Sequence, residues 1–440
     1  MASESSFPSQ SRVLEEPSPV PLALRRKVAL RLLPYLFLIY IIAFLDRVNI
    51  SYAVLEMRTE LGFSAKVLGL GMGIFFWGYF LLEIPSTVIV ERWSARKWMS
   101  RIMITWGFMA MGMGFLHSAR VMYLLRFLLG AAEAGFFPGI IVYLGHWFTK
   151  KDKAKAVALF MSALPVAFII GAPVSGSILG VHWLGLSGWR WIFILEGIPA
   201  IVFGIVNLWV LTDRPHQAGW LTRDEQDQLQ IALDREAHGK ASHLGVFAYA
   251  TNPVILLLTL IYFLTICASY GFGLWLPMML KSFHFSDFHT SLLAAVPYVV
   301  SLASMIFFGW NSDRTGERRW HTAIPFFIAA AGLSIGSIIH VTSLGWAMVG
   351  FCLVGMGIYS YMPSFWALPS LYLCGTAVAV ATGFINSFAN LGGFVGPYMM
   401  GYVQTHTGSF ALAMGVLLLA QVIAGSLVFV LKPPLSVDAS

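Results

Sequence analysis

Two pairs of oppositely charged residues lie inside stretches of this chain that otherwise read as membrane-buried. Asp46 and Arg47 stand side by side near the end of the apolar segment 32–53, and Arg126 and Glu133 lie in the apolar segment 121–146. On insertion scales, each such charge at the centre of a membrane helix costs about 2.5–3.5 kcal/mol. Four unpaired charges would cost about 10–14 kcal/mol. Charges kept at such a cost predict a polar site inside the membrane, on a substrate and ion pathway.

The spacing of these four residues limits which of them can pair. Arg126 and Glu133 are seven positions apart, which puts them on one face of a helix but about 10 Å apart along its axis. We therefore expect each to find its partner on the first span. There Asp46 and Arg47 point about 100° apart and face different neighbours. The pattern predicts a four-membered network, and the alternative is a static ion pair that locks the two spans together.

The same four residues could couple an anion to protons. A guanidinium keeps its charge and offers a planar fork to a carboxylate, so we expect Arg47 to grip an anionic substrate, with Arg126 assisting or holding an acid. Asp46 and Glu133 can gain and lose protons, because burial favours the neutral acid and a nearby arginine favours the ionised one. Protonation of both acids frees the arginines for an anion, and loss of the protons expels it. This reciprocal coupling predicts symport.

The second half of the chain supplies polar and aromatic residues that suit the hydroxyl groups or the ring of a small acid. The candidates for substrate contact there are Tyr270, Tyr298, Tyr359, Ser364, Asn386 and Asn390. Asn386 and Asn390 lie four positions apart on one helix face, where hydrogen bonding between helices is the alternative role. For each tyrosine, the alternative is packing or anchoring at the bilayer interface.

Two further acids lie in apolar segments and are interpreted as structural. Glu83 lies near the cytoplasmic end of the second span, and Glu196 lies near the outer end of the sixth. Arg190, six positions before Glu196, is available as its partner.

The composition is that of a membrane protein throughout. Of 440 residues, 58% are hydrophobic and 11% are charged, with a mean hydropathy of +0.75, whereas soluble domains carry about 25% charged residues. The net charge of +7 fits Lys and Arg gathered in cytoplasmic loops, so we expect no nucleic-acid partner. Three widely spaced cysteines and the lack of an HExxH motif predict no disulfide framework, metal site or cofactor. With no nucleophile or catalytic loop, we expect no enzyme.

About twelve apolar segments are long enough to cross a bilayer as helices, which takes about 20 residues. They run over 32–53, 67–90, 98–116, 121–146, 155–180, 190–211, 254–280, 290–311, 322–341, 345–366, 376–403 and 410–431. Lys and Arg concentrate in the loops on the side of the N-terminus, which predicts that both termini are cytoplasmic.

The expected fold class is an all-α membrane protein made of two six-helix bundles. A polar stretch divides the apolar segments into halves of similar size and predicts a short amphipathic surface helix. The expected parts are a disordered cytoplasmic tail (1–30), a first bundle (31–211), a cytoplasmic central loop (212–252), a second bundle (253–431) and a cytoplasmic tail (432–440).

A short charged motif occurs once in each half. Residues 91–97 (ERWSARK) follow the second span, and residues 313–319 (DRTGERR) follow the eighth, 222 positions later. Two halves in the same orientation form the parallel repeat of secondary transporters, in which the site lies between the halves. We expect the charges of both copies to act as conformational latches that bond helix ends in one state and release them in another. These residues are Glu91, Arg92, Arg96, Asp313, Arg314 and Arg318.

These features together resemble the major facilitator superfamily, and within it the anion:cation symporter family. The second motif copy, Gly309–Arg319, matches the superfamily's loop pattern, whereas the first has Ser94 where a glycine is usual. More specific likenesses run over nearly the whole chain from Arg31 on. They are Leu45–Ser51, Arg126–Gly139, Gly188–Phe193 with Glu196-Gly197, Asp213–Pro215 with Trp220-Leu221, and Asn386–Pro397. The resemblance implies two halves that rock about a central site.

The resemblance also implies a proton-driven importer of small organic anions in a bacterial inner membrane. It suggests sugar acids and hydroxy acids such as tartrate or galactonate first, and an aromatic acid such as phthalate next. We expect a monomeric, multi-pass protein whose partners are the anion, protons and the lipid bilayer. A proton-independent exchanger or facilitator is the alternative in the same fold, and a sensor that binds without transporting is a further one.

Overall fold

The computed structural model describes residues 20–237, 251–338, 343–373 and 376–431, and helices make up most of them. The helices of the first half are α1 (Leu22–Val48), α2 (Ile50–Leu61), α3 (Ala65–Arg92), α4 (Ala95–Met113), α5 (Ala119–Glu133), α6 (Phe136–Gly145), α7 (Lys150–Met161), α8 (Ala163–Leu179), η1 (Trp183–Gly185) and α9 (Gly188–Val210). Between the halves lie η2 (Pro215–Gln217) and α10 (Arg223–Ala237). The helices of the second half are α11 (Pro253–Lys281), α12 (Asp287–Thr315), α13 (Arg319–Ile338), α14 (Leu344–Ser360), α15 (Met362–Phe365), α16 (Pro369–Tyr372), α17 (Thr376–Ala389), α18 (Gly392–Thr407) and α19 (Ala411–Val428).

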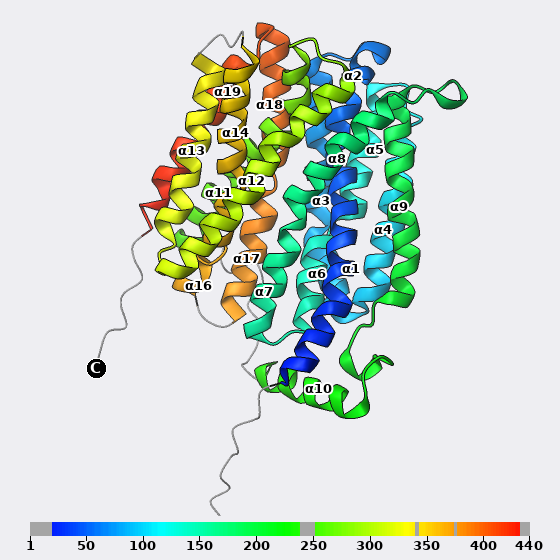
Figure 1. The fold of residues 1–440 in the computed structure, drawn as a ribbon, viewed down its shortest axis with the longest axis vertical. Coiled ribbons are helices and arrows are strands. Elements are labelled where there is room, and N and C mark those ends of the chain that lie inside the picture. The colour runs from blue at the N-terminus through cyan, green and yellow to red at the C-terminus, as the bar shows by residue number, and fades with distance from the viewer. Residues whose placement is uncertain (1–19, 238–250, 339–342, 374–375, 432–440) are drawn as a thin grey trace, which may run out of the picture.

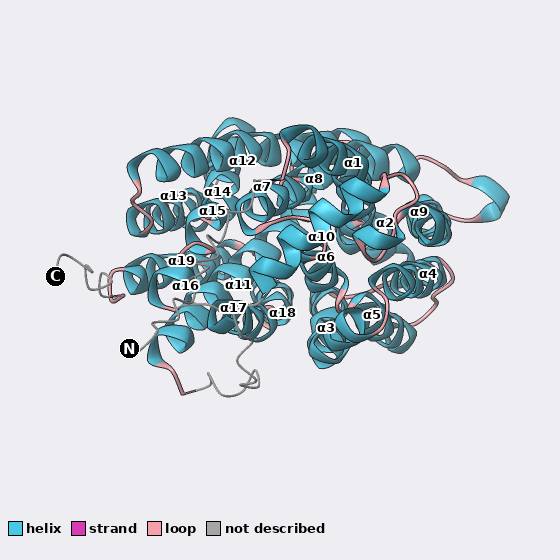
Figure 2. Ribbon diagram, turned by 90° about the horizontal axis from the view of Figure 1, so that it is seen from below, coloured by secondary structure: helices cyan, strands magenta, loops and turns pink. Residues whose placement is uncertain are grey.

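The helices form two bundles that stand side by side. Helices α1–α9 gather on one side and α11–α19 on the other, as both the side view and the view from below show (Figures 1 and 2). Helix α10 lies across one end of the first bundle (Figure 1). Helix α1 begins at this end (Figure 1). In the second bundle, α19 ends beside the start of α13, where the Arg319 guanidinium donates to the Phe429 carbonyl at 2.8 Å. We call this end cytoplasmic, following the predicted orientation, and the opposite end outer.

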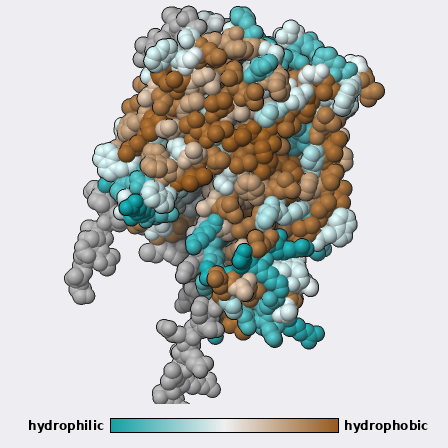
Figure 3. Space-filling view, in the orientation of Figure 1, coloured by the Kyte–Doolittle hydropathy of each residue, from teal (hydrophilic) through white to brown (hydrophobic). Residues whose placement is uncertain are grey.

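The surface and the helix lengths are those of a protein that crosses a membrane many times. Within the described ranges, nine helical stretches are long and apolar enough to span a bilayer. The other three predicted spans correspond to α4, α13 and the pair α17–α18, which stand beside them (Figure 1). Hydrophobic residues cover the middle of the visible face, with hydrophilic residues towards both ends (Figure 3). Such a band suits contact with lipid tails.

The sequence repeat is also a structural repeat. Helices α3 and α12 begin 222 positions apart and end 223 positions apart. The loop after α12 turns at Gly316, where φ is +71°, a conformation that glycine adopts without strain. Ser94, at the matching position, instead has φ −153° and accepts a hydrogen bond from the Lys97 N–H as the N-cap of α4. A serine serves here because capping, rather than a left-handed turn, is what the backbone needs.

Helix α1 begins at Leu22, earlier than the predicted first bundle, which starts at residue 31. Residues 22–30 are mostly good helix formers, and one face of this turn is buried through Leu24 and Val28. Arg25 forms an ion pair with Asp152 of α7, which ties the extension to the first bundle. The rest of the predicted N-terminal tail (1–19) and the tail 432–440 lie outside the described residues.

The two bundles meet closely in their outer halves. A Cβ atom built on Gly69 of α3 would lie 2.6 Å from the Pro397 carbonyl oxygen of α18, and one on Gly176 of α8 would lie 2.5 Å from Cβ of Ser291 on α12. Helix backbones can approach this closely only where a residue has no side chain. The interface is therefore closed on the outer side of the residues described next.

Candidate functional site

A helix break marks the centre of the first bundle. α1 continues into α2 through Asn49, whose φ of −54° and ψ of −32° are helical, whereas α5 ends at Glu133, before an extended Ala134 and a Gly135 with φ +84°. A Cβ on Gly135 would lie 2.1 Å from the Ser86 hydroxyl, so only glycine fits this turn. Irregular backbone at membrane depth is tolerated where it is buried in protein or lines a cavity. This break directly follows Glu133, a predicted site residue.

Arg47 is the hub of the site. Its guanidinium forms an ion pair with Glu133 through Nη2 and donates through Nη1 to the Tyr270 hydroxyl of α11 at 3.2 Å. The side chain of Arg47 is 11% exposed and that of Glu133 is 4% exposed. The Nε of Arg47 has no hydrogen-bond partner among the described residues. Arg47 thus joins an acid of its own bundle to a tyrosine of the other and has one N–H donor left unbonded.

Arg126 stands one layer behind Arg47. The ring of Phe75 lies 5.2 Å from the Arg47 guanidinium carbon and 5.0 Å from that of Arg126. Arg126 donates to the carbonyls of Gly71 and Met72 at 3.2 and 3.3 Å, and its Nη1 has no partner in the described part of the chain. Arg126 forms no ion pair of its own and shares the field of Glu133 with Arg47, so neutralisation of Glu133 would leave both guanidiniums to attract an anion.

Asp46 faces away from both arginines. One of its carboxylate oxygens accepts a hydrogen bond from the Trp106 indole of α4 at 2.8 Å, and the other has no described partner. The prediction that Asp46 and Arg47 face different neighbours is therefore confirmed. The predicted four-membered network is wrong in its connections, because α1 turns Asp46 towards the interior of its own bundle while Arg47 faces the second bundle.

A narrow cavity of about 60 Å³ opens beside Arg47 between the bundles. Of the predicted substrate contacts, Arg47, Tyr270, Tyr359, Asn386 and Asn390 line it. Ligand pockets commonly measure about 300–1,000 Å³, so the walls must separate before a small acid can enter.

Further aromatic residues that were not among the predicted contacts also line this cavity. They include Tyr40, Phe44, Tyr79, Phe137 and Tyr262. Tyr40 and Phe44 precede Arg47 by seven and three positions, and this helical spacing puts them on the same face. That spacing was the available signal.

The remaining predicted contacts, Arg126, Tyr298 and Ser364, lie outside the lining of this cavity. Tyr298 of α12 stacks on Phe168 of α8 with ring centroids 4.2 Å apart, so it packs one bundle against the other. Ser364 is fully buried in α15.

Glu83 and Asn386 form a hydrogen bond between the bundles on the cytoplasmic side of the cavity. The Asn386 amide donates to the Glu83 carboxyl at 2.6 Å, joining α17 to α3. Both residues are buried. The alternative role for Asn386, hydrogen bonding between helices, is therefore present together with its place in the cavity wall.

Comparison with known proteins now places this architecture. Residues 36–397 match the family model of the Major Facilitator Superfamily. The chain belongs to this superfamily. It is 44% identical over 389 residues to a putative tartrate transporter of Agrobacterium vitis, an alignment that covers 88% of this chain and 89% of the relative. It is 40% identical over 400 residues to the putative metabolite transport protein NicT of Pseudomonas putida, covering 90% and 91%.

The fold agrees with solved members. The xylose transporter XylE of E. coli, in a partially occluded inward-open conformation, superposes with a TM-score of 0.74 at 14% identity, covering 94% of this chain and all of that one. At this identity the likeness shows the fold alone. This Major Facilitator Superfamily protein is accordingly a multi-pass transport protein of the cell membrane and not an enzyme.

The two charged loop motifs of this superfamily protein bond within their own bundles. The Arg96 N–H and the Ser94 hydroxyl donate to the Asp213 carboxylate at 2.8 and 2.7 Å. In the second copy, Arg318 pairs with Asp313 at 2.7 Å. Three other predicted latch residues, Glu91, Arg92 and Arg314, are exposed. Asp213, from the loop after α9, is a partner that the motif alone did not indicate.

The sequence offered Arg190 as a partner for Glu196, but the two residues do not pair. Arg190 pairs with Glu60 at the end of α2 at 3.0 Å and donates to the carbonyls of Gly114 and Leu116. The physical reason is helical geometry, since residues six apart in α9 point to different sides.

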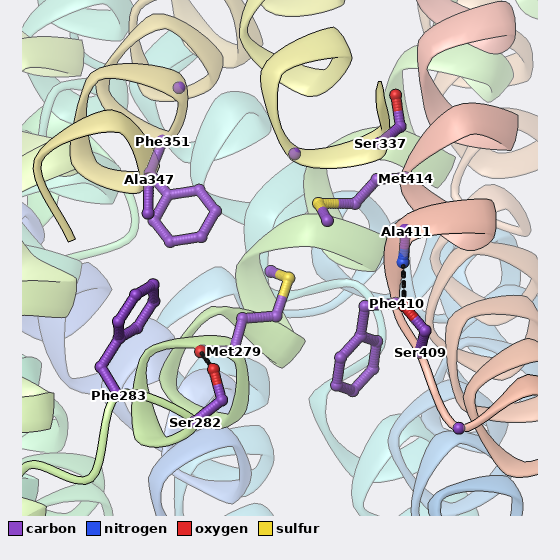
Figure 4. A pocket seen from close by; sticks show the side chains of 13 residues that line it. Met279, Ser282, Phe283, Ser337, Ala347, Phe351, Ser409, Phe410, Ala411 and Met414 are labelled. Carbon is purple, nitrogen blue, oxygen red and sulfur yellow. Dashed lines mark hydrogen bonds between the residues drawn. The ribbon is translucent and has the colours of Figure 1, made fainter. Parts of the chain in front are cut away.

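A larger cavity, of about 300 Å³, lies at the outer end of the second bundle (Figure 4). Met279, Phe351 and Met414 project from α11, α14 and α19 towards it, with Ser282 and Ser409 at its edge. None of its described lining residues is ionisable. It is separate from the charged site around Arg47.

Proposed function

We propose that this protein takes up a small organic anion, such as a sugar acid or hydroxycarboxylate, together with protons, by alternating access. The observation that carries the proposal is the ion pair of Arg47 with Glu133 at the wall of the cavity between the bundles. An arginine supplies a fixed charge for the anion, and a carboxyl can leave that arginine by taking up a proton.

Counting charges explains the coupling. With both acids ionised, Asp46 and Glu133 balance Arg47 and Arg126, so the four groups carry no net charge. Protonation of Glu133 leaves a net charge of +1 in a buried site, and protonation of Asp46 as well leaves +2. An anion is then attracted by the field of both arginines and can accept a hydrogen bond from the unpaired Nε of Arg47, which lines the cavity.

The rest of the site suits a hydroxylated acid. Tyr270, Tyr359, Asn386 and Asn390 offer hydroxyl and amide groups from the second bundle, which can bond the hydroxyls of a substrate whose carboxylate is held by Arg47. The relative named as a putative tartrate transporter supports an acid of this kind. The cavity extends from Arg47 to Asn386 beside Glu83, so substrate release on the cytoplasmic side would separate this bonded pair.

The first experiment is a thermal-shift screen of the purified protein against organic acids at two pH values. Ligands that bind the native state raise the apparent melting temperature by mass action. We expect stabilisation by hydroxycarboxylates that is stronger at low pH and absent in Arg47→Ala. A hit that is independent of pH would favour the proton-independent exchanger or facilitator, and a hit with neutral sugars or cations only would overturn the anion proposal.

A further inference from the structure

A second line of polar residues runs along α1 and α2, on the side away from the cavity. Asp46, Asn49, Tyr52, Glu56 and Glu60 follow one another at intervals of three or four residues, and this spacing puts them on one helix face. The line starts at Asp46, which is 1% exposed, and reaches the exposed Glu60 at the outer end. It therefore connects the centre of the first bundle with the outer surface.

Glu196 of α9 faces the inner part of this line. Ser175 of α8 donates a hydrogen bond to one of its carboxyl oxygens at 2.7 Å, and the other oxygen has no described partner. The Asn49 amide faces the same carboxyl without reaching hydrogen-bond geometry. Asp46 and Tyr52 both lie close enough to interact electrostatically with Glu196. Glu196 itself is 5% exposed.

Neither of these two acids forms an ion pair with a cation in the described part of the chain. The helices that surround them present Trp106 from α4 and Ser175 from α8. Arg190 is drawn to Glu60 instead. The basic residues of α4 stand at its cytoplasmic end, where Arg96 bonds the Leu208 carbonyl. An unpaired carboxylate in a dry interior costs several kcal/mol and takes up a proton instead.

The unsatisfied polar atoms point to what the two acids bind. Asp46 and Glu196 each keep one oxygen without a described partner, and neither side-chain atom of the fully buried Asn49 has one. Buried polar atoms are nearly always satisfied. Protons on the carboxyls would supply donors that this cluster lacks, and the Asn49 amide can then donate to one acid while accepting from the other.

We propose that Asp46 and Glu196 form a proton-binding pair, reached from the outer surface along Asn49, Tyr52 and Glu56 rather than through the substrate cavity. Two adjacent buried acids resist carrying two charges, so the pair holds at least one proton. A proton taken from outer water passes to Glu196 and then to Asp46, and each ionised carboxylate accepts it in turn. Asp46 adjoins Arg47 in the chain, so its charge acts on the anion site.

The outer end of this path carries further charged groups that set its local potential. Glu56 accepts a hydrogen bond from the Trp189 N–H at 3.1 Å and interacts with Glu60, His182 and Asp287. Glu60 is held by Arg190 and by the Trp189 indole. Lys281 pairs with Asp287 at 2.8 Å and Arg190 pairs with Glu60, so Glu56 is the acid of this group that can receive a proton, while the closed outer interface excludes the larger anion.

The inference rests on the proposed proton-coupled function, and two measurements separate them. The first is infrared spectroscopy of the protein in lipid, which detects the carbonyl stretch of protonated carboxyls without any substrate. We expect a protonated-carboxyl band that is weakened in Glu196→Gln, shifted in frequency in Ser175→Ala, and unchanged in Glu225→Gln at the surface. An unchanged band in Glu196→Gln would overturn the proposal.

The second measurement is uptake of radiolabelled tartrate by proteoliposomes. In Glu196→Gln we expect uptake driven by a pH gradient to fall about tenfold, a typical coupling between sites, while tartrate exchange at equal pH is retained. A wild-type protein with no gradient-driven uptake would contradict the proposed function and leave the infrared result to decide the inference. Gradient-driven uptake in Glu196→Gln equal to wild type would refute the proton path. Retained tartrate exchange at equal pH in Glu196→Gln checks that the loss of gradient-driven uptake does not come from misfolding.

Discussion

The Arg47 guanidinium and the Tyr270 hydroxyl lie 3.2 Å apart across the interface between the two bundles. The same guanidinium holds Glu133 of its own bundle. Arg47 therefore has one partner that can be neutralised by a proton and one that belongs to the opposite half. In the proposed function, substrate binding, protonation of Glu133 and the relative position of the bundles all act on this one side chain.

Replacement of Tyr270 by phenylalanine should weaken substrate binding by about tenfold or more, because one hydrogen bond to a charged group is worth about 1.5–3 kcal/mol. The matched control is Tyr298→Phe. The Tyr298 side chain lies outside the cavity, and its buried hydroxyl has no described hydrogen-bond partner. Titration calorimetry with the acid found in the thermal-shift screen measures both affinities. Equal affinity for Tyr270→Phe and wild type would mean that Tyr270 only packs against Arg47.

Glu133→Gln should bind the anion as well at neutral pH as the wild type does at low pH. The amide imitates the protonated acid, so Arg47 loses its counter-charge permanently. Binding then no longer responds to protons at this residue, and accumulation of substrate against a gradient should fail. The check is affinity against pH, together with uptake, for Glu133→Gln and Asp46→Asn. If both variants still concentrate substrate under a proton gradient, these acids do not couple it.

Gly130→Val should destabilise the first bundle strongly. A Cβ on Gly130 of α5 would lie 1.9 Å from the Phe75 carbonyl oxygen of α3, so the two helices must move apart. Overpacking of this kind costs about 1–3 kcal/mol or more. It also displaces Phe75, which stands between the two arginines. Gly383→Ala in α17 is the control, because a Cβ there meets nothing within 4 Å. Melting temperatures in detergent should fall for the first variant and hold for the second.

His146 predicts a pH dependence of stability at the cytoplasmic end of α6. Burial, together with the nearby Arg214, lowers the pKa of His146 to about 4. The fold thus favours the neutral ring. The neutral ring adds roughly 3 kcal/mol to the free energy of unfolding. This gain is complete above the unfolded pKa of about 6.5 and is lost as the pH falls towards 4.

The measurement is the melting temperature of wild type and of His146→Gln between about pH 7.5 and about pH 5. We expect the wild type to lose more stability than the variant over this range, because glutamine does not titrate. Parallel curves for the two proteins would show that the ring is hydrated and that its burial has no effect on stability.

Particular residues show how far sequence reasoning reached into the site. The charges of Asp46, Arg47, Arg126 and Glu133 were recognised because each is costly in an apolar segment, wherever its partner lies. Their connections were not, since the rotation of α1 and the insertion of Phe75 between the arginines depend on packing against α3 and α4. Glu196 was assigned to the nearest arginine in the chain, but helical rotation gave Arg190 to Glu60.

The sequence by itself determined the membrane spans, the repeat and the superfamily. Apolar runs, charge distribution and motif spacing can be recognised along the chain without knowing which helices pack against each other. The sequence also determined that a charged site exists. Only the tertiary structure decided that Arg47 pairs with Glu133 and donates to Tyr270, while its neighbour Asp46 accepts from Trp106. The tertiary structure also decided that Glu196 faces the polar residues of α1 and α2 next to Asp46. These pairings depend on which helix faces meet, and the contacts that orient them come from residues far apart in the chain.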